Sequence, residues 1–163
     1  PKIPGIQFPT RITTAYRADY GPAFRGKGIV SVDPPRVGSA FPMLVPQVDA
    51  DGIDVGGIRM PETAVPLATY TGWNLRSPDI GAPNQLSTQI GSFIPFARTK
   101  AERMKNNDPR LSIEERYSGK EDYLQKFEAA AKALAGDRYL LPGDVANITK
   151  RGAAEWDYVT LKP

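Results

Sequence analysis

Apolar residues recur at spacings of three and four between residues 120 and 135, and this is the clearest periodicity in the chain. Such spacing places the apolar side chains along one stripe of an amphipathic helix. The stripe consists of Tyr123, Leu124, Phe127, Ala130, Ala131 and Leu134. Gly136 follows at the position where a C′ glycine commonly ends a helix, so we expect the helix to stop there.

Two shorter helices are predicted before this stripe. Residues 99–102 and 112–115 each carry the Ser/Thr-x-x-Glu pattern of a capping box, in which the side chains at the two ends satisfy free amides of the first turn. The first pattern predicts a short helix over about 100–106. The second predicts a helical turn that ends near Tyr117.

A last helix is predicted after the stripe, over about 142–151. Pro142 suits its first turn, because proline lacks the amide that would be unsatisfied there. We expect Val145, Ile148 and Leu141 to face inward from this helix.

Upstream of residue 98 the pattern changes, because prolines and glycines interrupt every apolar run. Short extended pieces and loops suit such a composition better than helices do. We predict an extended segment over Ile3–Ile12, a loop over Ala15–Gly28, and short strands at Gly28–Val32 and Met43–Val45. The stretch 77–97 is predicted to be irregular, with a buried loop or one short strand around Phe93.

The stretch 46–76 is the densest in features. Val45 and Val48 lead into Asp51-Gly52, a dipeptide typical of tight turns, and the apolar residues that follow predict a hairpin. Residues 64–76 cannot form a regular helix, since proline and β-branched residues interrupt them. An ordered, non-helical segment rich in aromatic and amide side chains is typical of a binding surface or of a seam between domains.

These elements predict an α+β chain in two zones. Residues 1–97 form an irregular, proline- and glycine-rich zone of extended segments, hairpin and loops that packs on a partner portion. Residues 98–163 form a helical zone. We expect the two zones together to make one partial domain, the C-terminal part of a larger protein. The chain begins Pro-Lys-Ile-Pro without an initiator methionine, which favours a processed chain or a piece of a longer one.

Composition excludes several chemistries. The chain has neither cysteine nor histidine, so it cannot supply a thiolate, a Cys/His zinc site or the histidine of a Ser-His-Asp triad. Its formal net charge of +3 is spread evenly, which disfavours nucleic-acid binding. No apolar run is long enough to cross a membrane. We predict no cofactor, no metal and no catalytic residue in this chain, and its compartment stays open.

Six residues of the central stretch are candidate ligand contacts. Arg59, Glu62 and Arg76 could bind a carboxylate or orient a catalytic group, and the alternative is an ion pair at a domain seam. A pocket with one directed amide could be lined by Tyr70, Trp73 and Asn74, and the alternative is simple packing of large aromatic rings.

Other motifs fail on spacing. Asp49, Asp51 and Asp54 suggest a calcium loop, but glycine and glutamate do not fall where an EF-hand needs them, so a polar turn is the better interpretation. Ser92 lacks the second glycine of a G-x-S-x-G elbow. Paired carboxylates for glycoside chemistry remain an open alternative, with Asp49, Asp51 and Glu62 as candidates, because a sequence does not specify their separation in space.

Several blocks together resemble a known family. These are Val45-Pro-Gln-Val-Asp-Ala-Asp-Gly52, Gly57-Ile-Arg-Met-Pro61, Val65-Pro-Leu-Ala-Thr-Tyr-Thr-Gly-Trp-Asn-Leu-Arg76, Gly91-Ser-Phe-Ile-Pro-Phe-Ala97, Asp108-Pro-Arg110 and Ser112-Ile-Glu-Glu-Arg-Tyr117. The chain resembles, over roughly residues 28–158, the C-terminal region of a bacterial family of alpha/beta hydrolase domain-containing proteins. The block Thr69–Arg76 is the most specific.

The resemblance implies a hydrolase of esters or amides whose serine and histidine lie outside this chain. The chain would then pack on the catalytic portion and contribute to a site wall or a seam, and would be inactive alone. The alternative is a non-enzymatic module that folds by itself and binds a ligand or a protein partner through Tyr70, Trp73 and Arg76.

Overall fold

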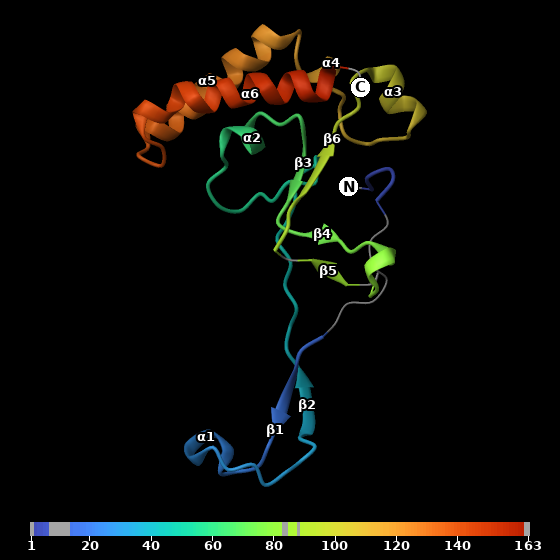
Figure 1. The fold of residues 1–163 in the computed structure, drawn as a ribbon, viewed down its shortest axis with the longest axis vertical. Helices are drawn as coiled ribbons and strands as arrows, with labels where there is room; N and C mark the ends of the chain where they lie inside the picture. The colour runs from blue at the N-terminus through green and yellow to red at the C-terminus, as the bar shows by residue number, and fades with distance from the viewer. Residues whose placement is uncertain (1, 7–13, 83–84, 88, 162–163) are drawn as a thin grey trace.

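The computed structural model describes residues 2–6, 14–82, 85–87 and 89–161. Figure 1 shows a body of helices and short strands, from which an arm projects at the opposite end from the long helices. The arm carries β1 (Tyr16–Asp19), α1 (Phe24–Lys27) and β2 (Arg36–Ala40). Helix and strand are mixed along the chain, so the fold is compatible with the α+β class.

The body begins with one helical turn and a set of short strands. In order these are α2 (Pro61–Ala64), β3 (Ala68–Thr71), β4 (Asn74–Leu75), the 3-10 turn η1 (Pro78–Ile80), β5 (Leu86–Ser87) and β6 (Ser92–Pro95). Among the described residues the strands form three antiparallel pairs, β1–β2, β3–β6 and β4–β5. Thr69 lies opposite Ile94 in the β3–β6 pair.

The rest of the body is helical. It contains α3 (Lys100–Lys105), α4 (Ile113–Arg116), α5 (Lys120–Gly136), the 3-10 turn η2 (Pro142–Asp144) and α6 (Val145–Thr160). Side chains cap the starts of α3 and α4 as the sequence predicts. Thr99 accepts a hydrogen bond from the Glu102 amide, and Ser112 and Glu115 form a complete capping box.

Helices α5 and α6 pack side by side over the β3–β6 pair, and the core lies between them. Tyr123 and Phe127 on α5 and Leu67 before β3 are fully buried. Gly152 on α6 faces the Phe127 ring, and a Cβ placed there would lie 2.7 Å from the ring carbon Cε1. The buried cluster consists of Leu67, Phe96, Ile113, Tyr117, Tyr123, Phe127, Ala131, Ile148 and Val159.

A buried arginine ties the strand pair to the loop between α3 and α4. Arg110 and Asp108 are 3% and 6% exposed, and the guanidinium donates through Nη2 to Asp108 Oδ2 at 2.7 Å. Its Nη1 donates to Thr69 Oγ1 at 2.8 Å and to the Ile94 carbonyl at 3.0 Å. Burial acts to raise the pKa of Asp108, but the hydrogen bonds from Arg110 outweigh it and hold that pKa below its ordinary value.

The predicted hairpin over residues 45–58 is only partly confirmed. Its turn forms at Asp51-Gly52, where Gly52 has φ +78°, and a single bridge joins Val48 to Asp54. Flanking strands do not form. The turn is closed by Asp49, whose carboxylate accepts from the amides of Asp51 and Ile53, which supports the polar-turn interpretation over the calcium loop.

Three predictions for the N-terminal region are wrong. Ala15–Gly28 is not a plain loop, because it holds β1 and α1, while Gly28–Val32 and Met43–Val45 form no strand. The strand lies instead at Arg36–Ala40. β-branched residues favour strands only where a pairing partner is in register, and the sequence does not specify that partner. Much of the segment predicted over Ile3–Ile12 lies outside the described residues.

The helix ends also differ from prediction. Gly136 is still helical, and the left-handed residue after α5 is Arg138, with φ +66°. The last helix continues to Thr160, nine residues beyond the predicted end at 151. Leu141 is 70% exposed, so its predicted inward orientation is wrong, whereas Ile148 is buried as expected. Among the helices of the described ranges, none has the length and apolar character that a bilayer crossing requires.

The close contact at Gly152 yields a stability prediction. Gly152→Ala would gain about 1 kcal/mol of helix propensity, but its Cβ would overlap the Phe127 ring, and overpacking costs about 1–3 kcal/mol. We expect a net loss of stability in thermal melts. Gly136→Ala is the matched control, because a Cβ there meets no atom within 4 Å. Equal melting temperatures for the two variants would contradict the packing described here.

Candidate functional site

Two of the six predicted site residues meet helix α6. Tyr70 on β3 donates its hydroxyl hydrogen to Glu155 Oε1. Glu62 on α2 accepts from Arg151 Nη2 at 3.0 Å. Arg151 and Glu155 are one helical turn apart on α6, so both contacts form along one side of the helix. We call these four residues, Glu62, Tyr70, Arg151 and Glu155, the Glu155 cluster.

The Glu155 cluster holds a carboxyl group with altered acidity. Burial raises the pKa of Glu155, and the negative charge of Glu62 adds to this effect. The Tyr70 hydrogen bond and the positive charge of Arg151 act in the opposite direction, and the net result is a raised pKa. Burial and the charge of Glu155 also raise the pKa of Tyr70. The cluster can therefore hold a proton at a higher pH than an ordinary carboxyl group can.

A further phenol lies beside the cluster. Tyr123 is fully buried, and its hydroxyl has no hydrogen-bond partner among the described residues. Its ring packs against Trp156 and Tyr117, both with centroids at 5.2 Å. Burial raises the pKa of Tyr123, and the charge of Glu155 contributes to the increase. Two phenols and one carboxyl group of raised pKa thus meet where β3, α5 and α6 come together.

Arg59 lies elsewhere and has a local role. Its Nη2 donates to Asp49 Oδ2 at 2.7 Å and to the Asp54 carbonyl at 3.0 Å, so it braces the turn at Asp51-Gly52. Burial acts to raise the pKa of Asp49, but hydrogen bonds from Arg59 and from backbone amides outweigh it and lower that pKa. Arg59 thus forms an ion pair inside the turn that it braces.

Trp73, Asn74 and Arg76 form a third group at the far end of the β3–β6 pair. The Trp73 carbonyl accepts from Ser92 Oγ at 2.7 Å, and Asn74 Oδ1 accepts from the Leu75 amide at 2.8 Å. Arg76 Nε donates to the Gly81 carbonyl at 2.7 Å. All three are half-buried, and Ser92 on β6 also donates to Asn74 Oδ1 at 3.2 Å, so the neighbouring strand holds both Trp73 and Asn74. The six predicted residues thus occupy three places and do not converge on one site.

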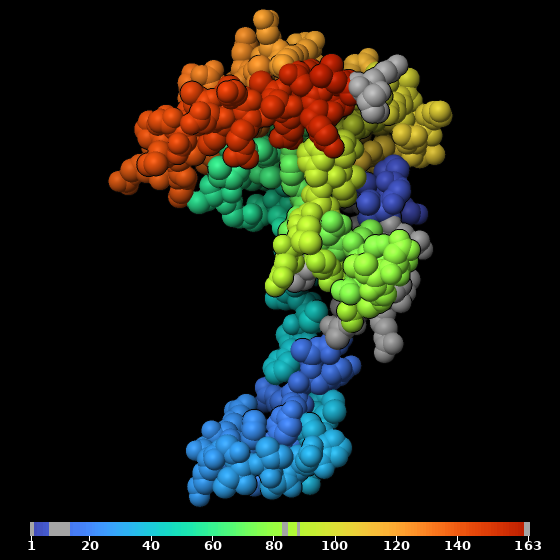
Figure 2. Space-filling view, viewed as in Figure 1, coloured from blue at the N-terminus to red at the C-terminus, as the bar shows by residue number. Residues whose placement is uncertain are grey.

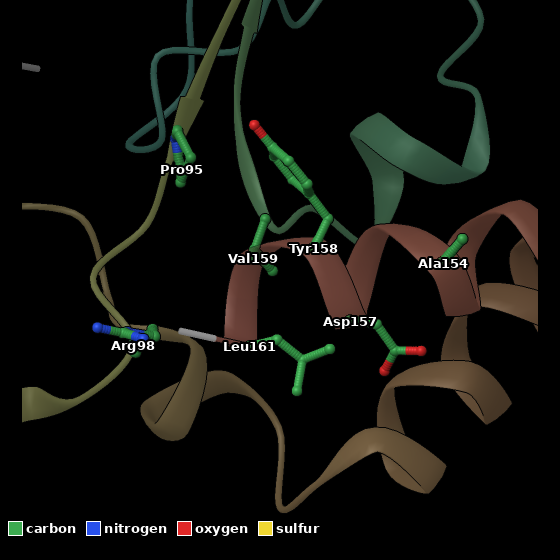
Figure 3. A pocket seen from close by; sticks show the side chains of 7 residues that line it. All are labelled: Pro95, Arg98, Ala154, Asp157, Tyr158, Val159 and Leu161. Atoms are coloured by element: carbon green, nitrogen blue, oxygen red, sulfur yellow. The ribbon is translucent and has the colours of Figure 1, made fainter. Parts of the chain in front are cut away.

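The end of α6 contributes a separate, largely apolar hollow of about 620 Å³. Figure 3 shows its lining, with the Tyr158 side chain pointing toward the strands and Asp157 on another side of the helix. Its two charged members are engaged elsewhere: Arg98 with Glu102 at 3.8 Å and Asp157 with Lys120 at 2.6 Å. The lining residues are Pro95, Arg98, Ala154, Asp157, Tyr158, Val159 and Leu161. None of these was predicted from the sequence.

Sequence reasoning missed the α6 side of the Glu155 cluster. The helix was expected to end at 151, which left Glu155 outside any element. The spacing of Arg151 and Glu155 matches one helical turn and could have signalled a shared face. Their pairing with Glu62 and Tyr70 joins positions 89 and 85 residues apart, and no local pattern reports such a pairing.

The sequence of the chain was compared with protein families, curated proteins and solved structures. A family described as alpha/beta hydrolase domain matches residues 7–150, which is most of the chain. The chain belongs to this family of alpha/beta hydrolase domains. No curated protein and no solved structure matches it.

The raised pKa of Glu155 yields a pH prediction. A carboxyl group whose pKa is higher in the folded state stabilises the fold at low pH, and this contribution is lost as pH rises through the folded-state pKa. Glu155→Gln keeps an oxygen that accepts from Tyr70 and removes the charge. We expect this variant to melt near the wild-type temperature at pH 4 and above it at pH 8.

The control for this experiment is Glu128→Gln on the same helix pair. Glu128 forms an exposed ion pair with Lys132 one turn away, at 2.8 Å. Loss of such a pair costs about 0.3–0.5 kcal/mol, so this variant should be slightly less stable at pH 8. A Glu155→Gln variant that loses stability at pH 8 would contradict the assigned pKa direction.

Proposed function

We propose that this chain is the C-terminal portion of a bacterial hydrolase of esters or amides, and that its catalytic serine and histidine lie in a separate catalytic portion. The family match over residues 7–150 carries this proposal. The chain has no histidine and no G-x-S-x-G pattern, and hydrolases of this class use a serine at such an elbow with a histidine as base. The portion that completes the chemistry therefore lies elsewhere.

Within that enzyme, segment 46–76 contributes to the site wall or to the seam with the catalytic portion. Two arginines fix the shape of the segment. Arg116 on α4 donates to the Asp51 carboxylate, with Nη1 at 2.8 Å from Oδ2, and Arg59 braces the turn beside it. Apart from the single turn of α2 the segment is non-helical, and such an ordered segment presents side chains at fixed positions, as a pocket wall requires.

The two-zone division belongs to the same proposal. Residues 1–97 supply the surface that packs on the catalytic portion, and residues 98–163 supply the helical support behind it. Arg110 and Arg116 come from the helical zone and reach Thr69 and Asp51 in the other zone. These hydrogen bonds would hold residues 1–97 in a fixed conformation while they contact the catalytic portion.

The alternative function is a non-enzymatic module that folds alone and binds a ligand or protein. The buried cluster around Tyr123 and Phe127 favours independent folding of the body. A cooperative melt of the chain without any co-purifying polypeptide would favour this alternative over the hydrolase.

The hydrolase proposal predicts that the purified 163-residue chain is inactive. With p-nitrophenyl acetate and butyrate we expect no turnover above the uncatalysed rate, because the chain has no histidine to activate a serine. The same assay on the protein with its catalytic portion should show turnover that a fluorophosphonate abolishes. Turnover by the isolated chain would contradict the proposal that the catalytic serine and histidine lie in a separate portion.

The wall role predicts a specific kinetic change in the active enzyme. Trp73→Ala removes a half-buried ring of segment 46–76, and we expect KM to rise about tenfold with little change in kcat, as for lost uniform binding. Tyr139→Ala is the matched control, since this aromatic residue is 60% exposed beyond the end of α5. Identical kinetics for both variants would contradict the proposed contribution of segment 46–76 to the wall of the active site.

A further inference from the structure

Residues 14–45, which we call the arm, hold no buried side chain. Every residue of the arm is described, and each is exposed or half-exposed. Figure 2 shows the arm extending away from the body. Val37, Leu44 and Val45 are 73%, 91% and 82% exposed. Apolar side chains exposed in one contiguous stretch mark an interaction surface.

The hairpin of the arm has little to support it. β1 pairs with β2, Tyr20 packs on Phe24 with centroids at 4.7 Å, and Arg17 lies over the Phe41 ring at 5.8 Å. A two-stranded hairpin without a further layer is marginally stable in water. The outer edges of both strands also carry backbone groups that are available for pairing. The arm therefore needs a second surface to hold its shape.

The accessible surface area of the chain is larger than that of a compact monomer of the same mass. Its accessible area is 11,523 Å², whereas a compact monomer of 17.8 kDa exposes about 8,000 Å². The excess is roughly 3,500 Å², well above the ~800 Å² that one partner contributes to a standard interface. An excess of this size fits a permanent contact better than a transient one.

The charges of the arm indicate the chemistry of the covering surface. The arm contains four cationic and two anionic side chains, so it carries a formal charge of +2. The cations are Arg17, Arg25, Lys27 and Arg36, and the anions are Asp19 and Asp33. None of the four cations pairs with a carboxylate in the described ranges. A matching surface would be apolar at its centre and would carry carboxylates at its rim.

The extent of the family match indicates which partner this is. The match begins at residue 7 and includes the whole arm, so the arm belongs to the hydrolase domain and is no appended tail. Domains of the α/β class are built on a mostly parallel sheet, whereas the paired strands in the described ranges are antiparallel.

We propose that the arm docks on the sheet-bearing catalytic portion of the hydrolase, along an apolar surface rimmed by carboxylates. This inference rests on the proposed function, because it takes that portion as the partner. Leu44 and Val45 lead directly from the arm into segment 46–76, so docking of the arm would also place that segment beside the catalytic portion.

The test is site-specific photo-cross-linking in the protein as its own cells produce it. Benzoylphenylalanine replaces Val37 in the arm or, as the control, Lys132, whose side chain is 64% exposed. Lys132 belongs to α5, the helix that lies at the opposite end of the molecule from the arm in Figure 1. Cross-linked peptides are sequenced by mass spectrometry. We expect position 37 to join a peptide of the polypeptide that carries G-x-S-x-G, at least tenfold more often than position 132 does.

The other outcomes overturn the proposal. A product of two copies of this chain would assign the arm to self-association, and no product, or a product with an unrelated protein, would leave the arm without its proposed partner. Fluorophosphonate labelling of the same sample separates this inference from the proposed function. A labelled serine without a cross-link from position 37 refutes only the docking. A cross-link to an unlabelled polypeptide of the same family refutes only the hydrolysis.

A second variant measures the energetics of docking. Leu44→Asp places a charge in the most exposed apolar position of the arm, and we expect the catalytic portion to dissociate at least tenfold more readily in sedimentation. Leu141→Asp is the matched control, because Leu141 is similarly exposed, at 70%, but lies on the body. Equal dissociation of the two variants would refute a role of the arm in docking.

Discussion

The buried pair of Arg110 and Asp108 is the interaction on which the body depends. The guanidinium reaches Thr69 on β3 and the carbonyls of Ile94 and Pro95 on β6, and its face lies 5.1 Å from the Phe96 ring. A charge this deeply buried is tolerated only when its partner and its hydrogen bonds are complete. One residue therefore fixes the strand pair, the α3–α4 loop and the edge of the core in a single arrangement.

Two other arginines also form ion pairs that join separate elements of the body. Arg103 joins α3 to Glu115 on α4 at 2.7 Å, and Arg116 joins α4 to Asp51 in the turn of segment 46–76. The body is thus held by polar links around an aromatic core. The arm has neither core nor ion pairs in the described ranges, although it belongs to the same family match. This contrast is the physical basis for expecting a permanent partner.

The sequence predicts those parts of the fold that local chemistry determines. The stripe of α5 and the capping residues Thr99 and Ser112 are confirmed, because helix periodicity and caps depend on near neighbours. The strands of the arm were misplaced, since strand pairing depends on distant residues. The candidate site was predicted only in part, because Tyr70 meets Glu155 across 85 residues and the role of Arg110 appears only when the strands are in place. Family resemblance, carried by the block Thr69–Arg76, gave the correct class where local patterns could not.

We propose that this chain is one portion of a larger hydrolase assembly, and the native mass of the protein is the sharpest test of that proposal. The measurement is native mass spectrometry of the protein from its own cells, followed by denaturing mass spectrometry of its components. We expect a particle that contains additional polypeptide with a G-x-S-x-G serine and a histidine. A single, stable species at the 17.8 kDa of this chain, or at a simple multiple of it, would show that no catalytic portion is bound.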